Sequence, residues 1–429
     1  MYQMSLGFRS LLFRKKQYIS LFLVCAFGVC VSVFCLFLID GMLSALKMRA
    51  KLYYGGDLQF IGGTRNLYFA DYKAEIEKLK EIFPEEAIIT PRFDFDSRNA
   101  AIYFEGTGVR QRVVKGVDFE KEAESFKKVT FVSGSFEEMA GSNGILLSKP
   151  IAAMLEVKVG DMVTFMLRNS ENYINTVLLE VKGIFTDSSV FGMYTSYMDI
   201  DVLRNAYGMD CNACNRITIC FPEQAPSQKE INYYQRELEK KYNMFPLTSD
   251  KQIFYEKLFS MQAEQGPIHA LIQLSAYLQE VKIVIDAMYF ISYLVIAILI
   301  LIVVIGISST YRVLVMKRTD EIGIYMAIGM QRRGIREILL FETFFLLFFG
   351  CVSGIILSQF LCFLLRFIDF SFIPAFDIFL SNGNIVPIVT FNAIFSVCGI
   401  VIVTTAAAVL FAVQKVVKMT PCQALSFSA

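Results

Sequence analysis

The residues that could carry chemistry are few and scattered along the chain. The sequence has one histidine, His269, and no tryptophan. It has no G-x-S-x-G or H-E-x-x-H motif, and no G-x-x-x-x-G-K-[ST] loop that could bind nucleotide phosphates. The acidic pairs Asp94/Asp96 and Glu137/Glu138 are predicted to be solvated surface charges rather than acid–base pairs. We therefore predict no catalytic residue on this chain.

Cysteines offer the other candidate chemistry. Cys211, Cys214 and Cys220 lie in a polar region, whereas the others lie in apolar segments or near the C-terminus. Cys211-Asn-Ala-Cys214 has the spacing of half a zinc or redox site, but no second pair completes it. A local disulfide, if this region lies outside the cytoplasm, and ordinary loop thiols are the alternatives. We predict no metal site.

The composition is that of a membrane protein. The chain of 429 residues is 55% hydrophobic and 19% charged, which is less charge than a soluble protein of this length would carry. Its formal net charge is +1, so no overall basic field favours nucleic acid as a partner. Scarce histidine also argues against histidine-based acid–base catalysis.

Four apolar stretches are long enough to cross a bilayer as helices, which requires about 20 residues each. The expected spans are residues 17–40, 285–311, 338–365 and 387–413. We interpret the first as a retained anchor rather than a signal peptide. Its apolar run is too long for a signal peptide, and Asp40-Gly41-Met42 is a poor cleavage site.

Basic residues in the short flanks predict the orientation of these spans. The N-terminus (1–16), the loop 312–336 and the tail 414–429 are rich in lysine and arginine, so we expect them in the cytoplasm. The loop 366–386 has Arg366 against Asp369 and Asp377, which favours the opposite side. The large polar segment 41–280 must then lie on that opposite side as well.

Short helical and strand patterns alternate in segment 41–280, which predicts an α+β domain of mixed sheet. Expected helices are 71–82, 150–155, 199–207 and 228–242, and expected strands include 102–104, 112–114, 162–167, 177–184 and 217–221. A turn at Gly106-Thr107-Gly108 is expected to join the first two of these strands. Helical stalks, 42–52 and 273–286, should connect the domain to the first and second spans.

The loop 312–336 carries the most informative pattern in the chain. Basic residues precede Asp320-Glu321, and a short apolar helix follows and closes at Gly329. A short helix of this kind at the membrane surface could dock into a groove of another protein. It could equally be an interfacial connector. The residues alone leave both alternatives open.

This loop resembles the FtsX/MacB/LolC–LolE family of ABC-transporter permeases. The resemblance rests on Lys317-Arg318-Thr319-Asp320-Glu321-Ile322-Gly323-Ile324, on Ala327-Ile328-Gly329 and Arg332-Arg333, on Gly350 and Gly354, and on the terminal segments 8–14 and 418–425. It implies a membrane α-helical protein with four transmembrane helices and a MacB/FtsX-like α+β domain inserted between the first two. It also implies a coupling helix that contacts a cytosolic ATPase, with site residues Arg318, Asp320, Glu321, Ile322, Gly323, Ala327 and Gly329.

Within the family, segments 181–185 and 193–207 are most similar to the lipoprotein-releasing permeases LolC and LolE, although Asp187-Ser188-Ser189 departs from their pattern. The resemblance implies a LolD-like ATPase dimer that binds ATP and Mg²⁺, with no cofactor on this chain. It implies a second permease subunit, either a copy or a paralogue, and a LolA-like periplasmic carrier. The expected location is the bacterial inner membrane. The alternatives are a MacB-like efflux permease for peptides or toxins and an FtsX-like regulator of a cell-wall hydrolase.

A lipoprotein-releasing permease needs an apolar cavity for acyl chains, and the outer halves of the first two spans would form it. Apolar walls can replace lipid contacts at little cost, because each methylene moved is worth about 0.8 kcal/mol. The candidate lining residues are Phe34, Phe37, Leu38 and Met42 on the first span and Met288, Ile291 and Leu294 on the second. Ordinary packing or lipid contact is the alternative interpretation for each of them.

Overall fold

The protein divides into two compact units. Unit 1 comprises residues 1–43, 284–369 and 384–429, and unit 2 comprises residues 44–283 and 370–383. The computed structural model describes residues 13, 15–62, 68–95, 100–187, 192–247, 254, 256–258, 260–261, 267–370, 379–380 and 383–417. The family-like terminal segments 8–14 and 418–425 therefore lie almost entirely outside the described residues, as do Ser188 and Ser189.

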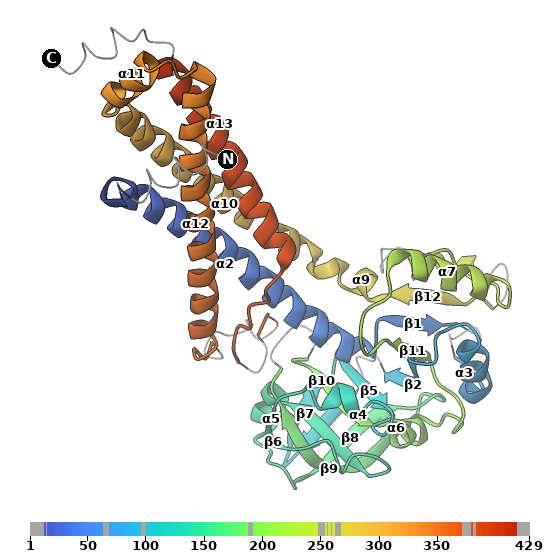
Figure 1. Ribbon diagram of the computed structural model, residues 1–429. Coiled ribbons are helices and arrows are strands. Elements are labelled where there is room, and N and C mark those ends of the chain that lie inside the picture. Colours follow the sequence, from blue (N-terminus) through green and yellow to red (C-terminus); the bar gives the residue numbers. More distant parts are fainter. Residues whose placement is uncertain are drawn as a thin grey trace. The chain divides into compact units, whose positions relative to one another are not determined.

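Long apolar helices build unit 1 (Figure 1). They are α2 (Lys15–Tyr54), α10 (Gln279–Met316), α12 (Arg332–Leu365) and α13 (Phe391–Val417), with the short α11 (Thr319–Ala327) between α10 and α12. Among the described residues, four helices are long and apolar enough to cross a membrane. Each coincides with one of the stretches expected from the sequence, and α2 and α10 both continue into unit 2.

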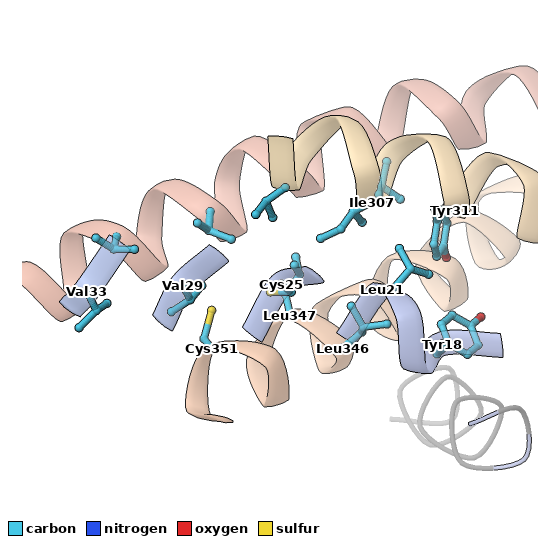
Figure 2. Packing of buried hydrophobic residues seen from close by; sticks show 14 of the residues in the cluster. Tyr18, Leu21, Cys25, Val29, Val33, Ile307, Tyr311, Leu346, Leu347 and Cys351 are labelled. Atoms are coloured by element: carbon cyan, nitrogen blue, oxygen red, sulfur yellow. The ribbon is translucent and has the colours of Figure 1, made fainter. Parts of the chain in front are cut away.

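Side chains from these four helices form one apolar core in unit 1. Figure 2 shows Cys25 and Val29 of α2 among residues of α10 and α12, including Ile307 and Leu347. The helices approach closely where the sequence has small residues. A Cβ atom on Gly350 would lie 2.8 Å from the Cys25 sulfur, and one on Gly354 would lie 2.7 Å from the Ala26 carbonyl oxygen. The two glycines are four residues apart, so they form a small-xxx-small face on α12 that packs on α2.

A single mixed sheet organises unit 2. Its strand order is β12-β1-β11-β2-β5-β10-β7-β9-β8-β3-β4, with β6 paired to β9. Neighbouring strands are antiparallel except for the pairs β5–β10 and β7–β9. The strands are β1 (Leu58–Ile61), β2 (Ile88–Phe95), β3 (Ala101–Phe104), β4 (Thr107–Arg110), β5 (Val113–Val117), β6 (Phe131–Gly134), β7 (Gly144–Ser148), β8 (Met162–Arg168), β9 (Ile174–Phe185), β10 (Thr195–Asp199), β11 (Arg216–Cys220) and β12 (Ala270–Gln273).

Helices pack on this sheet and divide its core into separate clusters. α3 (Tyr72–Lys80) and α7 (Gln228–Glu239) cover strands β1, β2 and β11, whereas α5 (Lys149–Leu155) and α6 (Ile200–Tyr207) pack with the strands around β7 and β9. The short α4 (Ala123–Phe126) contributes to a third cluster, and α9 (Leu274–Tyr277) follows β12. The helices α3, α5, α6 and α7 confirm the expected ones. Asp71 and Asp199 cap α3 and α6 with side-chain oxygens, as their sequence positions suggest.

The expected pairing of strands 102–104 and 112–114 is wrong. β3 instead pairs with β4, from Ala101 opposite Arg110 to Phe104 opposite Thr107. The two-residue turn between them consists of Glu105 and Gly106, whose φ angles are 45° and 88°. Two consecutive positive φ angles match the right-handed twist of a tight hairpin, so the chain turns back earlier than expected. The following strand, β5, pairs with β2 and β10 instead.

The prediction that Asp94 is a solvated surface charge is also wrong. Its carboxylate is 8% exposed and accepts a hydrogen bond from Lys115 at 2.8 Å, with Arg216 at 3.1 Å. The Lys115 ammonium is buried and lies 4.1 Å from the centre of the Tyr53 ring. Burial alone would raise the pKa of Asp94, but the neighbouring Lys115 and Arg216 outweigh it and the pKa lies below its usual value.

Lys115 predicts a pH-dependent stability. Burial lowers the pKa of its ammonium to about 8, although Asp94 opposes the shift. An unfolded lysine titrates near 10.4, so between these pH values the unfolded chain binds a proton that the folded chain has lost. The free energy of unfolding should therefore rise with pH over this window, because alkali removes the cost of burying the charge.

The comparison that isolates this effect is wild type against Lys115→Met, which cannot titrate and leaves Asp94 paired with Arg216. We expect the melting temperature of the detergent-solubilised wild type, minus that of the variant, to increase from pH 7.5 to pH 9.5. A constant or falling difference would show that Lys115 stays protonated in the folded protein.

Candidate functional site

The loop between α10 and α12 folds into the helix α11, and its end explains the sequence around Gly329. The Gly329 amide donates to the Met326 carbonyl at 3.1 Å, and the Met330 amide donates to the Tyr325 carbonyl at 2.9 Å. This pair of bonds is a Schellman motif, which requires a residue with positive φ after the helix. Gly329 has φ 95°, a conformation that glycine adopts without steric cost.

α11 has two different faces. Ile322 is buried, and Tyr325 and Met326 pack against the same helical core. Ile324 is 51% exposed and Ile328 is 78% exposed, with the exposed Ala327 between them. We call Ile324, Ala327 and Ile328 the outer stripe. Its spacing of three and four residues places it on one side of the helix, as in helices that dock into grooves of other proteins.

A buried charge network fixes the start of α11. Arg318 is 4% exposed, and its guanidinium donates to the Glu342 carboxylate of α12 at 2.7 Å. Tyr18 of α2 donates its hydroxyl to the same Glu342 oxygen at 2.9 Å and accepts from Arg318 at 3.3 Å. Arg318 also donates to Glu321 in the first turn of α11, at 3.1 Å. The network therefore connects α11 with both α2 and α12.

This network should make α11 move with the two long helices rather than independently. Glu342 is fully buried, so either charge without the other would be left in a medium of low polarity. Breaking a buried ion pair by removing one partner typically costs about 3–5 kcal/mol. We therefore expect a force applied to the outer stripe to reach α2 and α12 through contacts that are expensive to break.

The structure distributes the site residues expected from the sequence over both faces of the loop. Arg318, Ile322 and Gly323 are buried, Glu321 is partly exposed, and Ala327 and Gly329 are exposed. The side chain of Asp320 lies outside the described part. Arg318 and Ile322 therefore contact the helical core, and the outer surface belongs to the outer stripe.

The sequence did not predict the partners of Arg318, nor did it single out Ile324 and Ile328 beside the expected site residue Ala327. The partners of Arg318, Tyr18 and Glu342, are 300 and 24 residues away along the chain, and no local pattern connects them. The outer stripe did have a signal, because Ile324 and Ile328 are four residues apart at the end of a short helix.

The seven candidate cavity residues differ in exposure. Phe37 is buried within the helical core, and Phe34, Leu38, Met42 and Met288 are partly buried. Ile291 and Leu294 of α10 are 60% and 48% exposed. The exposed pair belongs to the long helix that the rest of the described chain covers least. Of the 18 most apolar consecutive residues in α10, 17% are buried, against 50% in α2 and in α12.

The cysteines of unit 2 show no bond to each other. Cys211, Cys214 and Cys220 are free thiols. Burial raises the pKa of the Cys214 thiol to about 12, which disfavours the thiolate needed for redox chemistry or metal binding. Within the described residues, no group of three or more His, Cys, Asp or Glu side chains could hold a metal ion.

Comparison with a family model identifies the domain that contains α11. Residues 293–421 match the family model of the FtsX-like permease C-terminal domain, a match that includes most of α10 and all of α11, α12 and α13. The C-terminal part of the protein thus carries a domain of the FtsX-like permease family. The match confirms the resemblance drawn from the loop motif.

A comparison with solved structures found a similar region. A solved structure of the periplasmic region of MacB from Actinobacillus actinomycetemcomitans is similar at 11% identity and a TM-score of 0.32. The similarity covers 53% of this chain and 94% of that one. A search of curated proteins found no significant match.

Proposed function

We propose that this permease releases lipoproteins from the bacterial inner membrane, driven by ATP hydrolysis on a separate cytosolic subunit. The observation that supports ATP-driven transport is the outer stripe: it is exposed, whereas α11 itself is fixed to the helical core. The preference for lipoproteins rests on the similarity of segments 181–185 and 193–207 to LolC and LolE.

The outer stripe is suited to an ATPase groove for a physical reason. Ile324 and Ile328 together offer an apolar surface to water, and such a surface gains free energy when a partner covers it. The ion pair between Arg318 and Glu342 would then carry the movement of the ATPase into α2 and α12. In this proposal ATP and Mg²⁺ bind the ATPase, a LolD-like dimer.

The exposed side of α10 supports a second permease subunit and an acyl-chain site. Its own chain leaves most of this helix uncovered, so another subunit or lipid must cover it. We propose that Ile291 and Leu294 face a cavity between two permease subunits, where acyl chains would replace lipid chains. Unit 2 would lie in the periplasm, both termini would lie in the cytoplasm, and a LolA-like carrier would receive the lipoprotein.

The test is the sorting of lipoproteins in cells depleted of the protein. We expect mature lipoproteins to accumulate in the inner-membrane fraction, because their release stops. Re-expression of Leu294→Gln should restore sorting only partly. Phe363→Gln on α12, at a phenylalanine that is 56% exposed, is the matched control and should restore it fully.

Other outcomes would support one of the two alternative functions, efflux or regulation of a cell-wall hydrolase. Normal lipoprotein sorting with new sensitivity to peptides or drugs would overturn the proposal in favour of an efflux permease. Normal sorting with a defect in cell-wall hydrolysis would favour a regulator of the FtsX type.

A further inference from the structure

The C-terminal end of α2 terminates on side chains of the sheet. Arg92 of β2 donates from Nη1 to the carbonyl oxygens of Leu52 at 3.0 Å and Tyr53 at 3.2 Å. Gln59 of β1 donates from Nε2 to the carbonyl oxygen of Tyr54. The last carbonyl oxygens of a helix form the negative end of its dipole and lie beyond the regular hydrogen-bond ladder, so a buried guanidinium satisfies them well.

Arg92 is itself held rigidly. Its guanidinium is fully buried and makes a two-pronged ion pair with Glu122, with the Nε–Oε1 bond at 2.8 Å. Thr90 donates its hydroxyl to the same Glu122 oxygen at 3.0 Å. A bidentate pair fixes orientation as well as distance. The end of α2 is therefore attached rigidly to β2.

The chain that leads into α10 meets α2 at the same place. β1 follows α2, β12 precedes α9, and these two strands pair antiparallel, with Leu58 opposite Gln273. The rings of Tyr54 and Tyr277 stack, with centroids 4.0 Å apart. Tyr277, the last residue of α9, donates its hydroxyl to Oε1 of Gln59 at 2.6 Å.

One side chain therefore bridges the two helical connections. The Gln59 amide donates to the end of α2 and accepts from the end of α9, and it is 2% exposed. We call Tyr54, Gln59, Arg92, Glu122 and Tyr277 the stalk joint. The first stalk is the part of α2 from Ser44 to Tyr54, and the second stalk is the segment from Leu274 to Ile283, all within unit 2.

We propose that the stalk joint locks the two stalks to each other and to the sheet throughout the ATP cycle, with Gln59 as the central positioning residue. The two helices then move unit 2 as one piece and do not separate at its base. This proposal rests on the proposed function, because it assumes that ATP hydrolysis drives the helices.

The direct test is a distance between spin labels on the two stalks. Met48 on α2 and Ile283 on α10 are 43% and 80% exposed, so cysteines there would accept labels, after Cys211 and Cys422 are replaced by serine. The full-length protein would be measured with its ATPase in nanodiscs, with ADP and with ATP plus vanadate. We expect one narrow distance distribution that is the same in both states.

Variants of the joint should change this distance and the coupling together. Gln59→Met removes the hydrogen bonds with Tyr54 and Tyr277, and the long one from Arg216, at nearly constant volume. In this variant we expect a broadened distribution and at least a fivefold fall in substrate released per ATP hydrolysed. Tyr277→Phe should show the same defect in weaker form. Tyr242→Phe is the matched control, since it removes a hydroxyl bonded to Glu75 at 2.6 Å elsewhere in unit 2 and should change neither readout.

A cross-link provides the opposite test and needs no destabilised protein. Cysteines at Leu58 and Gln273, directly opposite on β1 and β12, would close the joint permanently on oxidation. We expect the ATP-driven release of substrate to survive the cross-link. Loss of release that returns on reduction would overturn the proposal, as would a wild-type distance that changes with nucleotide. Failure of the proposed function would be distinct, since no lipoprotein would be released even by wild type, whereas the distance still decides the joint.

Discussion

Replacement of Ile328 by aspartate is expected to abolish assembly of the permease with its ATPase while the permease itself stays folded. Ile328 is 78% exposed, so the fold does not depend on its side chain. In a groove, a carboxylate would lose its hydration without gaining a partner, which costs several kcal/mol. We expect affinity for the ATPase to fall at least 100-fold, a loss of about 3 kcal/mol. Ile324→Asp should have a similar effect.

Co-purification of the ATPase with tagged permease variants measures this loss. Val132 of β6, which is 56% exposed in unit 2, offers a control of the same chemical type, and Val132→Asp should retain the ATPase. Ile328→Val, which keeps an apolar surface, should retain it too. If Ile328→Asp co-purifies with the ATPase at the wild-type ratio, the outer stripe is not the docking surface.

Removal of the Glu342 carboxylate is expected to destabilise unit 1 strongly. Glu342→Ala leaves the Arg318 guanidinium buried with Tyr18 and Glu321 but without its closest counter-charge. The expected cost is about 3–5 kcal/mol, together with loss of the fixed start of α11. Thermal unfolding of the detergent-solubilised protein should show a clear fall in melting temperature.

The double variant Arg318→Met/Glu342→Met separates the unpaired charge from the lost anchor. Replacing both partners of a buried ion pair by apolar residues is often neutral or stabilising, so the melting temperature should recover. Release of substrate per ATP should remain below that of wild type, because α11 is no longer bonded to α12. A Glu342→Ala protein as stable as wild type would show that the pair contributes little.

Much of the architecture could be predicted because the signals are local. The long apolar runs that form α2, α10, α12 and α13 are each one continuous stretch of the sequence. The amphipathic spacing and cap residues of α3 and α6 lie within a few residues of each other. The loop motif that led to the family is one continuous segment.

The errors arose where structure depends on residues far apart in the sequence. Asp94 is polar and lies in a strand, so its sequence context predicts exposure. Only the sheet pairing of β2 with β5 brings Lys115 beside it. Arg318 belongs to a basic flank of a span, yet its hydrogen bonds to Glu342 and Tyr18 hold it in the core. Charge pairs formed by folding leave no periodic pattern, and the same holds for the stalk joint.

The central claim is that this permease uses a cytosolic ATPase to release lipoproteins, and lipoprotein sorting after depletion tests it most directly. The decisive quantity is the fraction of mature lipoprotein in the inner membrane, measured with re-expressed wild type and with re-expressed Ile328→Asp. The account predicts that the fraction rises severalfold on depletion, returns to normal with wild type, and stays high with Ile328→Asp. An inner-membrane fraction that does not change on depletion would contradict it.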